Sequence, residues 1–233
     1  DSEIINHYTF GGWSTQQGKD KTDDFDIQSV NVTENKKFYA VWNANSYKVT
    51  FDSNDGTPPT VNTEVDVVYN NLLSTSQVPT GLQREHYIFR GWSENPDVSD
   101  PVLFKVEQTP ITRPLALKAV WEKMAQVTFY LNDGNTPETK VAVLDVEIGT
   151  EVLPPTSPNN IPHYTFGGWS TSPGFEQENN FDTHKIITGD TQFYAVWNPV
   201  DYTVTFDSNG GDSYSEARSV AYGKSMEDLS LTL

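Results

Sequence analysis

Apolar and polar residues alternate along the segment Tyr47–Phe51, whose sequence is YKVTF. Alternation with a period of two residues is typical of a β-strand that buries one face. The turn-forming run Asn54-Asp55-Gly56 follows, and these residue types tolerate a positive backbone φ. The pattern predicts a strand that ends in a tight turn.

Three further segments complete a unit of the same kind. Val65–Tyr69 predicts a second strand, His86–Trp92 a third and Leu115–Trp121 a fourth. Between the second and third strands, a leucine pair at Leu72 predicts a short helix, because Pro79 would not allow a longer one. The expected order is strand, turn, strand, short helix, strand, long loop, strand.

The chain repeats this unit. The sequence HYTFGGWST at His7 returns unchanged at His163, and a looser copy, HYIFRGWSE, begins at His86. Trp13, Trp92 and Trp169 recur at intervals of 79 and 77 residues. A period a little under 80 residues exceeds that of solenoid repeats and suits small independent domains.

The boundaries predict four pieces. Residues 47–121 and 125–197 form a first and a second full repeat, each running from a VTF strand to a closing AVW segment. Residues 1–42 match only the C-terminal half of a repeat, and residues 202–233 only the N-terminal half. We call these the leading and the trailing half repeat.

The order of elements predicts an α+β fold that is mostly β, with one short helix on a four-stranded sheet. We expect tandem β-grasp (ubiquitin-like) repeats.

The chain resembles the Listeria-Bacteroides repeat, the B-repeat of listerial internalins and other bacterial surface proteins. The resemblance rests on VTFDSN at Val49 and Val204, the pair Tyr222-Gly223, HYTFGGW, and FYAVWN at Phe38 and Phe193, and it covers nearly the whole chain. It implies a β-grasp fold, secretion, a place on the cell surface and use as a spacer or adhesive module, and it supplies no catalytic residue. The family usually has Gly where this chain has His7, His86 and His163.

The structural signature of the repeat is a Phe-x-Gly-Trp motif followed by a closing tryptophan. Its residues in this chain are Phe10, Gly12, Trp13, Trp42, Phe89, Gly91, Trp92, Trp121, Phe166, Gly168, Trp169 and Trp197. The tryptophans lie in strands of alternating pattern, so we expect them to pack in the cores of the small repeats.

Composition excludes several classes of function. The chain has 233 residues and a net charge of −17, which disfavours binding to a phosphate backbone and so excludes nucleic acid as a partner. It has no cysteine for a disulfide or a thiolate metal site, and no apolar run long enough for a membrane span. Its aromatic residues are therefore the expected source of stability.

No catalytic motif is present. The sequence lacks a Gly-x-Ser-x-Gly elbow, a phosphate-binding glycine loop and a His-Glu-x-x-His pair, so we expect neither enzymatic activity nor a cofactor. Asp52, Asn54 and Asp55 resemble the start of a calcium loop, but Thr63 stands at the twelfth position, which predicts a plain hairpin turn. The three repeated histidines occur singly and are expected to pack where a strand begins.

Binding to a surface partner, a protein or a glycan, remains open. Tryptophans could form a platform for sugars, although core packing is the simpler interpretation. Tyrosines outside the core are further candidates for contacting a partner, namely Tyr8, Tyr39, Tyr130 and Tyr194.

The segments between repeats are short. Residues 43–46, 122–124 and 198–201 are all that separate a closing tryptophan from the next strand, which predicts a semi-rigid array acting as a stalk. The half repeats would expose apolar sheet edges. They are either cut points in a longer protein or the complementary halves of a head-to-tail filament, in which the partner is a second copy of the chain.

Overall fold

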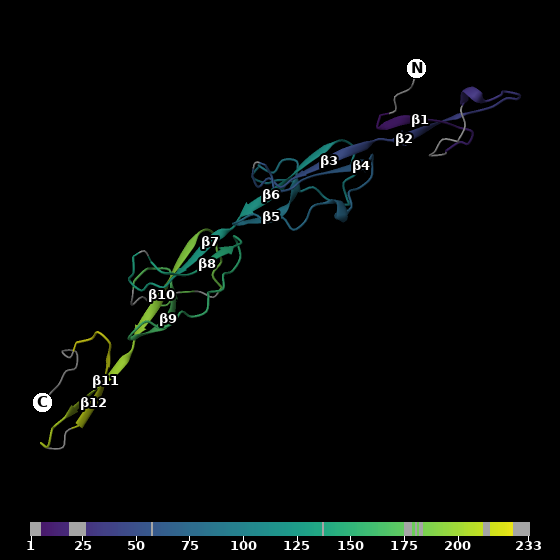
Figure 1. The fold of residues 1–233 in the computed structure, drawn as a ribbon. Helices are drawn as coiled ribbons and strands as arrows, with labels where there is room; N and C mark the ends of the chain where they lie inside the picture. The colour runs from purple at the N-terminus through teal and green to yellow at the C-terminus, as the bar shows by residue number, and fades with distance from the viewer. Residues whose placement is uncertain are drawn as a thin grey trace. The chain divides into compact units, whose positions relative to one another are not determined.

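The computed structural model describes residues 6–18, 27–56, 58–136, 138–174, 179, 181, 184–211 and 215–225. The chain divides into two compact units, Asp1–Glu122 and Lys123–Leu233. Within the described residues, each unit holds one four-stranded and one two-stranded sheet (Figure 1). Parts of both half repeats, including residues 1–5, 19–26, 212–214 and 226–233, lie outside the described residues.

The first full repeat forms a mixed sheet. Its strands are β3 (Ser46–Asp52), β4 (Asn62–Val68), β5 (Tyr87–Ser93) and β6 (Leu115–Lys123). Their order in the sheet is β4-β3-β6-β5. The central pair β3 and β6 is parallel, and β4 pairs antiparallel with β3.

The second full repeat has the same topology. Its strands are β7 (Ala125–Tyr130), β8 (Lys140–Val146), β9 (Tyr164–Ser170) and β10 (Thr191–Pro199). Their order is β8-β7-β10-β9, again with a parallel central pair. The mostly β architecture and the tandem repetition are therefore confirmed, whereas the β-grasp identification stays a prediction.

The two half repeats form antiparallel hairpins. β1 (Tyr8–Ser14) pairs with β2 (Tyr39–Ala44), and the three-residue 3₁₀-helix η1 (Ile27–Ser29) lies between them in sequence. β11 (Asp201–Asp207) pairs with β12 (Ser215–Ala221). By position in the repeat, β1–β2 corresponds to β5–β6, and β11–β12 corresponds to β3–β4.

Aromatic rings pack with aliphatic side chains in the core of each full repeat. Phe51 is fully buried and meets Trp92 edge-on, with ring centroids 4.9 Å apart. Phe129 and Trp169 repeat this contact at 4.9 Å in the second full repeat. Edge-to-face aromatic pairs contribute about 0.5–1.5 kcal/mol beyond their burial, which helps a small domain without disulfides.

The glycine of the Phe-x-Gly-Trp motif is required by its backbone. Gly12, Gly91 and Gly168 have φ values of 127°, 143° and 125°, a region that residues with a Cβ rarely adopt. In β1 the register shifts between Phe10 and Gly12, which marks a β-bulge that turns the following tryptophan. The repeated sequence thus encodes a repeated bend.

The expected short helix is only a 3₁₀-helix, η2 (Thr75–Gln77). The backbone near the leucine pair bonds elsewhere: Asn70 N–H donates to Ile111 O at 2.8 Å, and Ile111 N–H donates to Asn71 O at 2.9 Å. The second bond occupies the Asn71 carbonyl, which would accept the first hydrogen bond of a helix starting at Leu72. Leu73 instead fills the core with a fully buried side chain.

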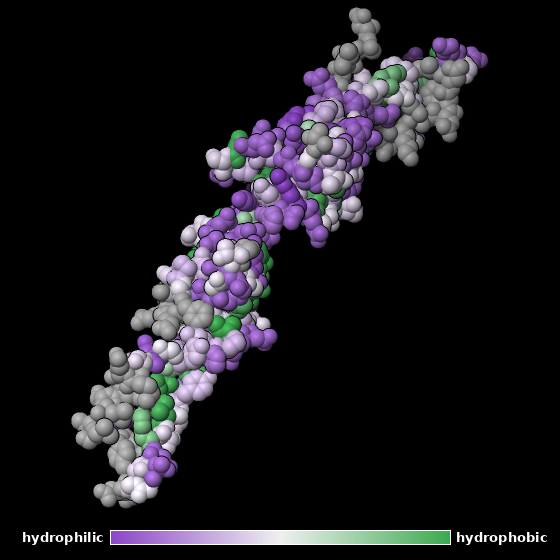
Figure 2. All heavy atoms as spheres, turned by 60° about the vertical axis from the view of Figure 1, so that its left-hand side comes forward, coloured by the Kyte–Doolittle hydropathy of each residue, from purple (hydrophilic) through white to green (hydrophobic). Residues whose placement is uncertain are grey.

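The half repeats expose part of the face that the full repeats bury. Trp13 and Phe10 are 40% and 42% exposed, whereas Trp92 and Trp169 are each 4% exposed. Hydrophobic atoms also gather in a strip on the β11–β12 hairpin (Figure 2). Phe206 of that hairpin is only partly buried, although its counterparts Phe51 and Phe129 are fully buried.

Candidate functional site

A histidine and two tyrosines connect the leading half repeat to the first full repeat. The His7 ring stacks on Tyr69, with centroids 4.2 Å apart and ring planes 7° apart. Nδ1 of His7 lies 2.7 Å from the hydroxyl oxygen of Tyr47, within hydrogen-bond distance. We call this set, His7 with Tyr47 and Tyr69, the first clamp.

The second unit contains an equivalent set. His163 stacks on Tyr222 at 4.2 Å with ring planes 12° apart, and its Nδ1 lies 2.9 Å from the hydroxyl oxygen of Tyr202. This second clamp connects the second full repeat to the trailing half repeat. Two junctions thus have one geometry, and both combine a histidine with two tyrosines that come later in the sequence.

Backbone hydrogen bonds reinforce both clamps. Asn45, the residue between β2 and β3, donates its N–H to His7 O at 2.9 Å, and its carbonyl accepts Tyr69 N–H at 2.7 Å. Val200, between β10 and β11, donates its N–H to His163 O at 2.8 Å, and its carbonyl accepts Tyr222 N–H at 2.9 Å. The connecting residue is therefore bonded to both of the repeats that it joins.

The clamp histidines occupy a backbone conformation that favours glycine. The φ values of His7 and His163 are 73° and 69°, in the left-handed region. Such a conformation costs a residue with a Cβ on the order of 1–2 kcal/mol. Glycine would avoid this cost but would supply no imidazole, so the clamp contacts offset the strain of having histidine there.

His86 begins the remaining copy of the motif, which is the middle one in the chain, and it also has a positive φ, of 64°. Its Nε2 lies 3.4 Å from Oε1 of Glu85. At the sequence positions that hold the clamp tyrosines elsewhere, the following repeat has Ala125 and Ile148. This association of histidine with two later tyrosines is the signal by which the clamps could have been found in the sequence.

The candidate calcium ligands form a hydrogen-bonded turn. Asp55 accepts bonds from Ser53 Oγ at 2.6 Å and from Thr60 N–H at 3.0 Å, and these bonds lower the pKa of its carboxyl to about 2. Oδ1 of Asp52 accepts Asn54 N–H at 2.8 Å. Within the described residues, no group of three or more acidic or histidine side chains is arranged to hold a metal ion.

The structure brings together two of the four candidate tyrosines. Tyr130 on β7 and Tyr194 on β10 lie side by side on adjacent parallel strands and stack at 5.4 Å with ring planes 17° apart. Tyr8 instead meets Tyr69 edge-on at 5.6 Å beside the first clamp. Tyr39 lies beneath Lys37, whose Nζ is 5.1 Å from the ring centroid.

Tyr194 is held in a fixed orientation. Its hydroxyl donates to Oε1 of Gln192 at 2.8 Å. Partial burial of the ring, with smaller contributions from Glu138 and Tyr130, raises the pKa of this phenol above its ordinary value of 10. The hydroxyl therefore stays protonated at neutral pH.

The tryptophans of the full repeats provide little surface for a ligand. Trp169 is 4% exposed, and Trp197 is fully buried, with its indole N–H donating to Leu131 O at 2.9 Å. Trp121 is partly buried and donates to Ser53 O at 2.6 Å. These positions match core packing and not a platform for sugars.

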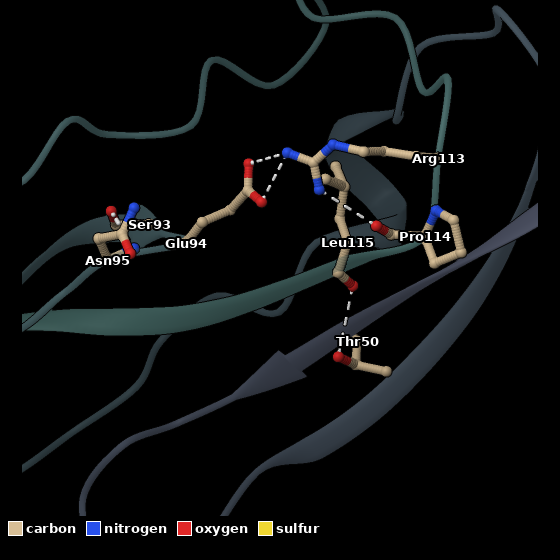
Figure 3. A network of polar contacts seen from close by, with 7 residues as sticks. All are labelled: Thr50, Ser93, Glu94, Asn95, Arg113, Pro114 and Leu115. Atoms are coloured by element: carbon tan, nitrogen blue, oxygen red, sulfur yellow. Dashed lines mark hydrogen bonds and ion pairs between the residues drawn. The ribbon is translucent and has the colours of Figure 1, made fainter.

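An ion pair at the base of a long loop gives no separate site. In Figure 3, Arg113 reaches Glu94, with its Nη2 2.9 and 2.8 Å from the two carboxylate oxygens, and Nη1 donates to Pro114 O at 3.3 Å. Below them, Thr50 Oγ1 donates to Leu115 O at 3.4 Å. The charged side chains are 59% and 39% exposed, so the pair adds little stability and mainly closes the loop between β5 and β6.

Comparison with known proteins gives the same repeat pattern. The family model described as the Listeria-Bacteroides repeat domain matches residues 5–41, 47–120, 126–196 and 202–232. A protein of Evansella cellulosilytica, named as a Gly-rich membrane protein, is 31% identical over 90% of the chain. A second protein from this organism, named as a membrane protein, is 30% identical over 82% of the chain.

The chain spans only 22% and 26% of the length of these two relatives. The described part of the chain contains no helix with the length and apolar character that a bilayer crossing requires. The similarity therefore concerns the repeats and not the other parts of the relatives.

Proposed function

Because the chain belongs to the Listeria-Bacteroides repeat family, we propose that it is a non-enzymatic stalk or adhesion segment of a microbial cell-surface protein. In this role the repeats hold another part of the protein away from the cell and keep neighbouring repeats in a fixed relation. The membrane-protein names of the two relatives support a place at the cell envelope.

The clamped junction is the observation that carries the proposal. In each unit, one residue separates the closing strand of one repeat from the opening strand of the next. The same three aromatic side chains brace this connection in both units. A flexible tether would need neither the bonded connecting residue nor the strained histidine, whereas a load-bearing spacer gains stiffness from both.

Distance measurements between spin labels test this stiffness. The chain has no native cysteine, so cysteines at exposed Gln16 and Lys118 would label the first unit, and cysteines at Ser172 and Thr205 the second. We expect one narrow distance distribution in each unit. His163→Ala should broaden the distribution in the second unit, and the first unit, measured in the same variant, is the matched control.

Broad distance distributions in the unmodified chain would refute a stiff stalk.

Brief protease treatment of intact cells tests the location of the repeats separately. We expect the protease to remove the repeats while the cells stay intact. Full protection of the repeats from the protease would contradict a place on the cell surface.

A further inference from the structure

The outer face of the second full repeat contains a hollow of about 540 Å³. Its lining comes from β7 and β10 and from the residues just after β9 and just before β10, and includes Gln126, Thr128, Thr171, Asp190, Gln192 and Tyr194. The lining residues within β7 and β10 alternate with core residues such as Phe129 and Phe193, so they lie on the face opposite the core. The volume falls within the range of small-molecule sites.

One wall of the hollow is a rigid aromatic ring. Tyr130 stacks against Tyr194 from the neighbouring strand, and Gln192 accepts a hydrogen bond from the Tyr194 hydroxyl. Both contacts fix the ring before any ligand arrives. A tyrosine held in this way offers apolar contact area at little entropic cost, together with a polar end.

Apart from Pro173, the rest of the lining is polar, and Asp190 is its one charged residue. Threonine hydroxyls and glutamine amides both donate and accept hydrogen bonds. Asp190 supplies the acceptor at the rim, and its Oδ1 is held by the N–H of Gln126 at 2.8 Å. One apolar wall facing mixed donors and acceptors suits a ligand that has an apolar face and a border of hydroxyl groups.

The fold does not require this arrangement. At the positions of Tyr130 and Tyr194, the first full repeat has Asp52 and Lys118, and it builds the same sheet. Elsewhere on its outer face, Lys48 forms an ion pair with Glu64 at 2.5 Å. A feature present in only one of two equivalent repeats is a property of that repeat and not of the architecture.

We propose that the hollow beside Tyr194 binds a neutral carbohydrate. A pyranose ring would lie against the phenol, and its hydroxyls would bond Gln126, Gln192 and Asp190. Anionic glycans fit poorly, because Asp190 lines the hollow and the chain has a net charge of −17. Addition of a peptide strand is excluded at this face, since β7 and β10 are the two central strands of the sheet.

A glycan array tests the proposal, with neutral oligosaccharides built from glucose, N-acetylglucosamine, mannose and galactose. Any hit is then titrated by calorimetry. Tyr194→Lys, which installs the residue of the first full repeat, should weaken binding about tenfold, as expected from losing one aromatic contact. Tyr130→Asp should weaken binding less, because Tyr130 acts by supporting Tyr194.

Tyr39→Lys makes the matched change at the same position of the leading half repeat and should leave binding unchanged. Thermal unfolding of each variant checks that the fold is retained. The proposal is overturned if no neutral glycan binds, if anionic glycans bind more strongly than all neutral ones, or if Tyr194→Lys binds as well as the unmodified chain. It does not depend on the stalk proposal, and its failure would leave the spin-label distances untouched.

Discussion

Removing the imidazole of His163 should loosen the second clamp by an amount that the structure allows us to work out. The stack on Tyr222 is worth about 0.5–1.5 kcal/mol, and the hydrogen bond to Tyr202 contributes a similar amount. Alanine keeps the left-handed backbone and loses both contacts, so His163→Ala should cost about 1–3 kcal/mol. Because His163 is exposed, the lower half of that range is expected.

Glycine separates strain from contact at the same position. His163→Gly loses the same contacts but relieves about 1 kcal/mol of backbone strain, so it should cost less than His163→Ala. A double-mutant cycle of His163→Ala with Tyr202→Phe isolates the hydrogen bond between the two side chains, whose coupling energy should be about 0.5–1.5 kcal/mol.

Native-state hydrogen exchange provides the assay. The amides of Val200 and Tyr222 take part in the backbone bonds at the clamp, so their exchange reports its opening. Each loss of 1.4 kcal/mol should speed this exchange about tenfold. The amide of Phe129 in the core should not change, and His184→Ala, which removes an exposed histidine elsewhere in the unit, is the control.

Unchanged exchange of Val200 and Tyr222 in His163→Ala would refute the clamp. Slower exchange in His163→Gly than in the unmodified chain would show that strain outweighs the contacts, and so that the histidine does not stiffen the junction.

Three further measurements follow from the structure. Hydrogen bonds lower the pKa of Asp55 to about 2, so the ionised carboxylate contributes its full stabilisation to the fold above the pKa of Asp in the unfolded chain, near 4. This contribution is lost as the pH falls from about 4 towards 2. Measured by urea unfolding, Asp55→Asn should lack this part of the acid-induced loss of stability. Burial raises the pKa of Tyr194 above its ordinary value of 10, so ionisation of this phenol above about pH 10 destabilises the fold. Tyr194→Phe should therefore lose less stability than the unmodified chain as the pH rises above about 10, measured by urea unfolding. Trp13→Phe should remove more acrylamide-quenchable fluorescence than Trp169→Phe, because their exposures are 40% and 4%.

The strands of each repeat could be predicted because one face is buried and alternation makes that visible. The alternation predicts a strand over Tyr47–Phe51, and the structure has β3 at Ser46–Asp52. The loss of the predicted helix at the leucine pair could not be foreseen from the local sequence, since the partner of the Asn71 carbonyl is Ile111, which is distant along the chain. Only the folded repeat decides between a helix and that long-range pairing.

The candidate tyrosines show the same limit. Tyr130 and Tyr194 meet because β7 and β10 are adjacent and parallel, a relation that crosses most of a repeat. Tyr8 and Tyr39 share the surface character that made them candidates, but their neighbours in space are Tyr69 and Lys37. Residue type alone could not predict which of these rings would lie together.

The histidine at the start of the motif separates what the fold needs from what this chain adds. A left-handed residue is needed there, and glycine meets that need without strain. His7 and His163 accept the strain and are followed by tyrosines that use the imidazole, whereas His86 is followed by Ala125 and Ile148 at the corresponding positions. Since the sheets are alike in both full repeats, the clamp is not a requirement of folding. Because the clamp contacts lie at the junction, opening of the junction is the property that should change first when the imidazole is removed.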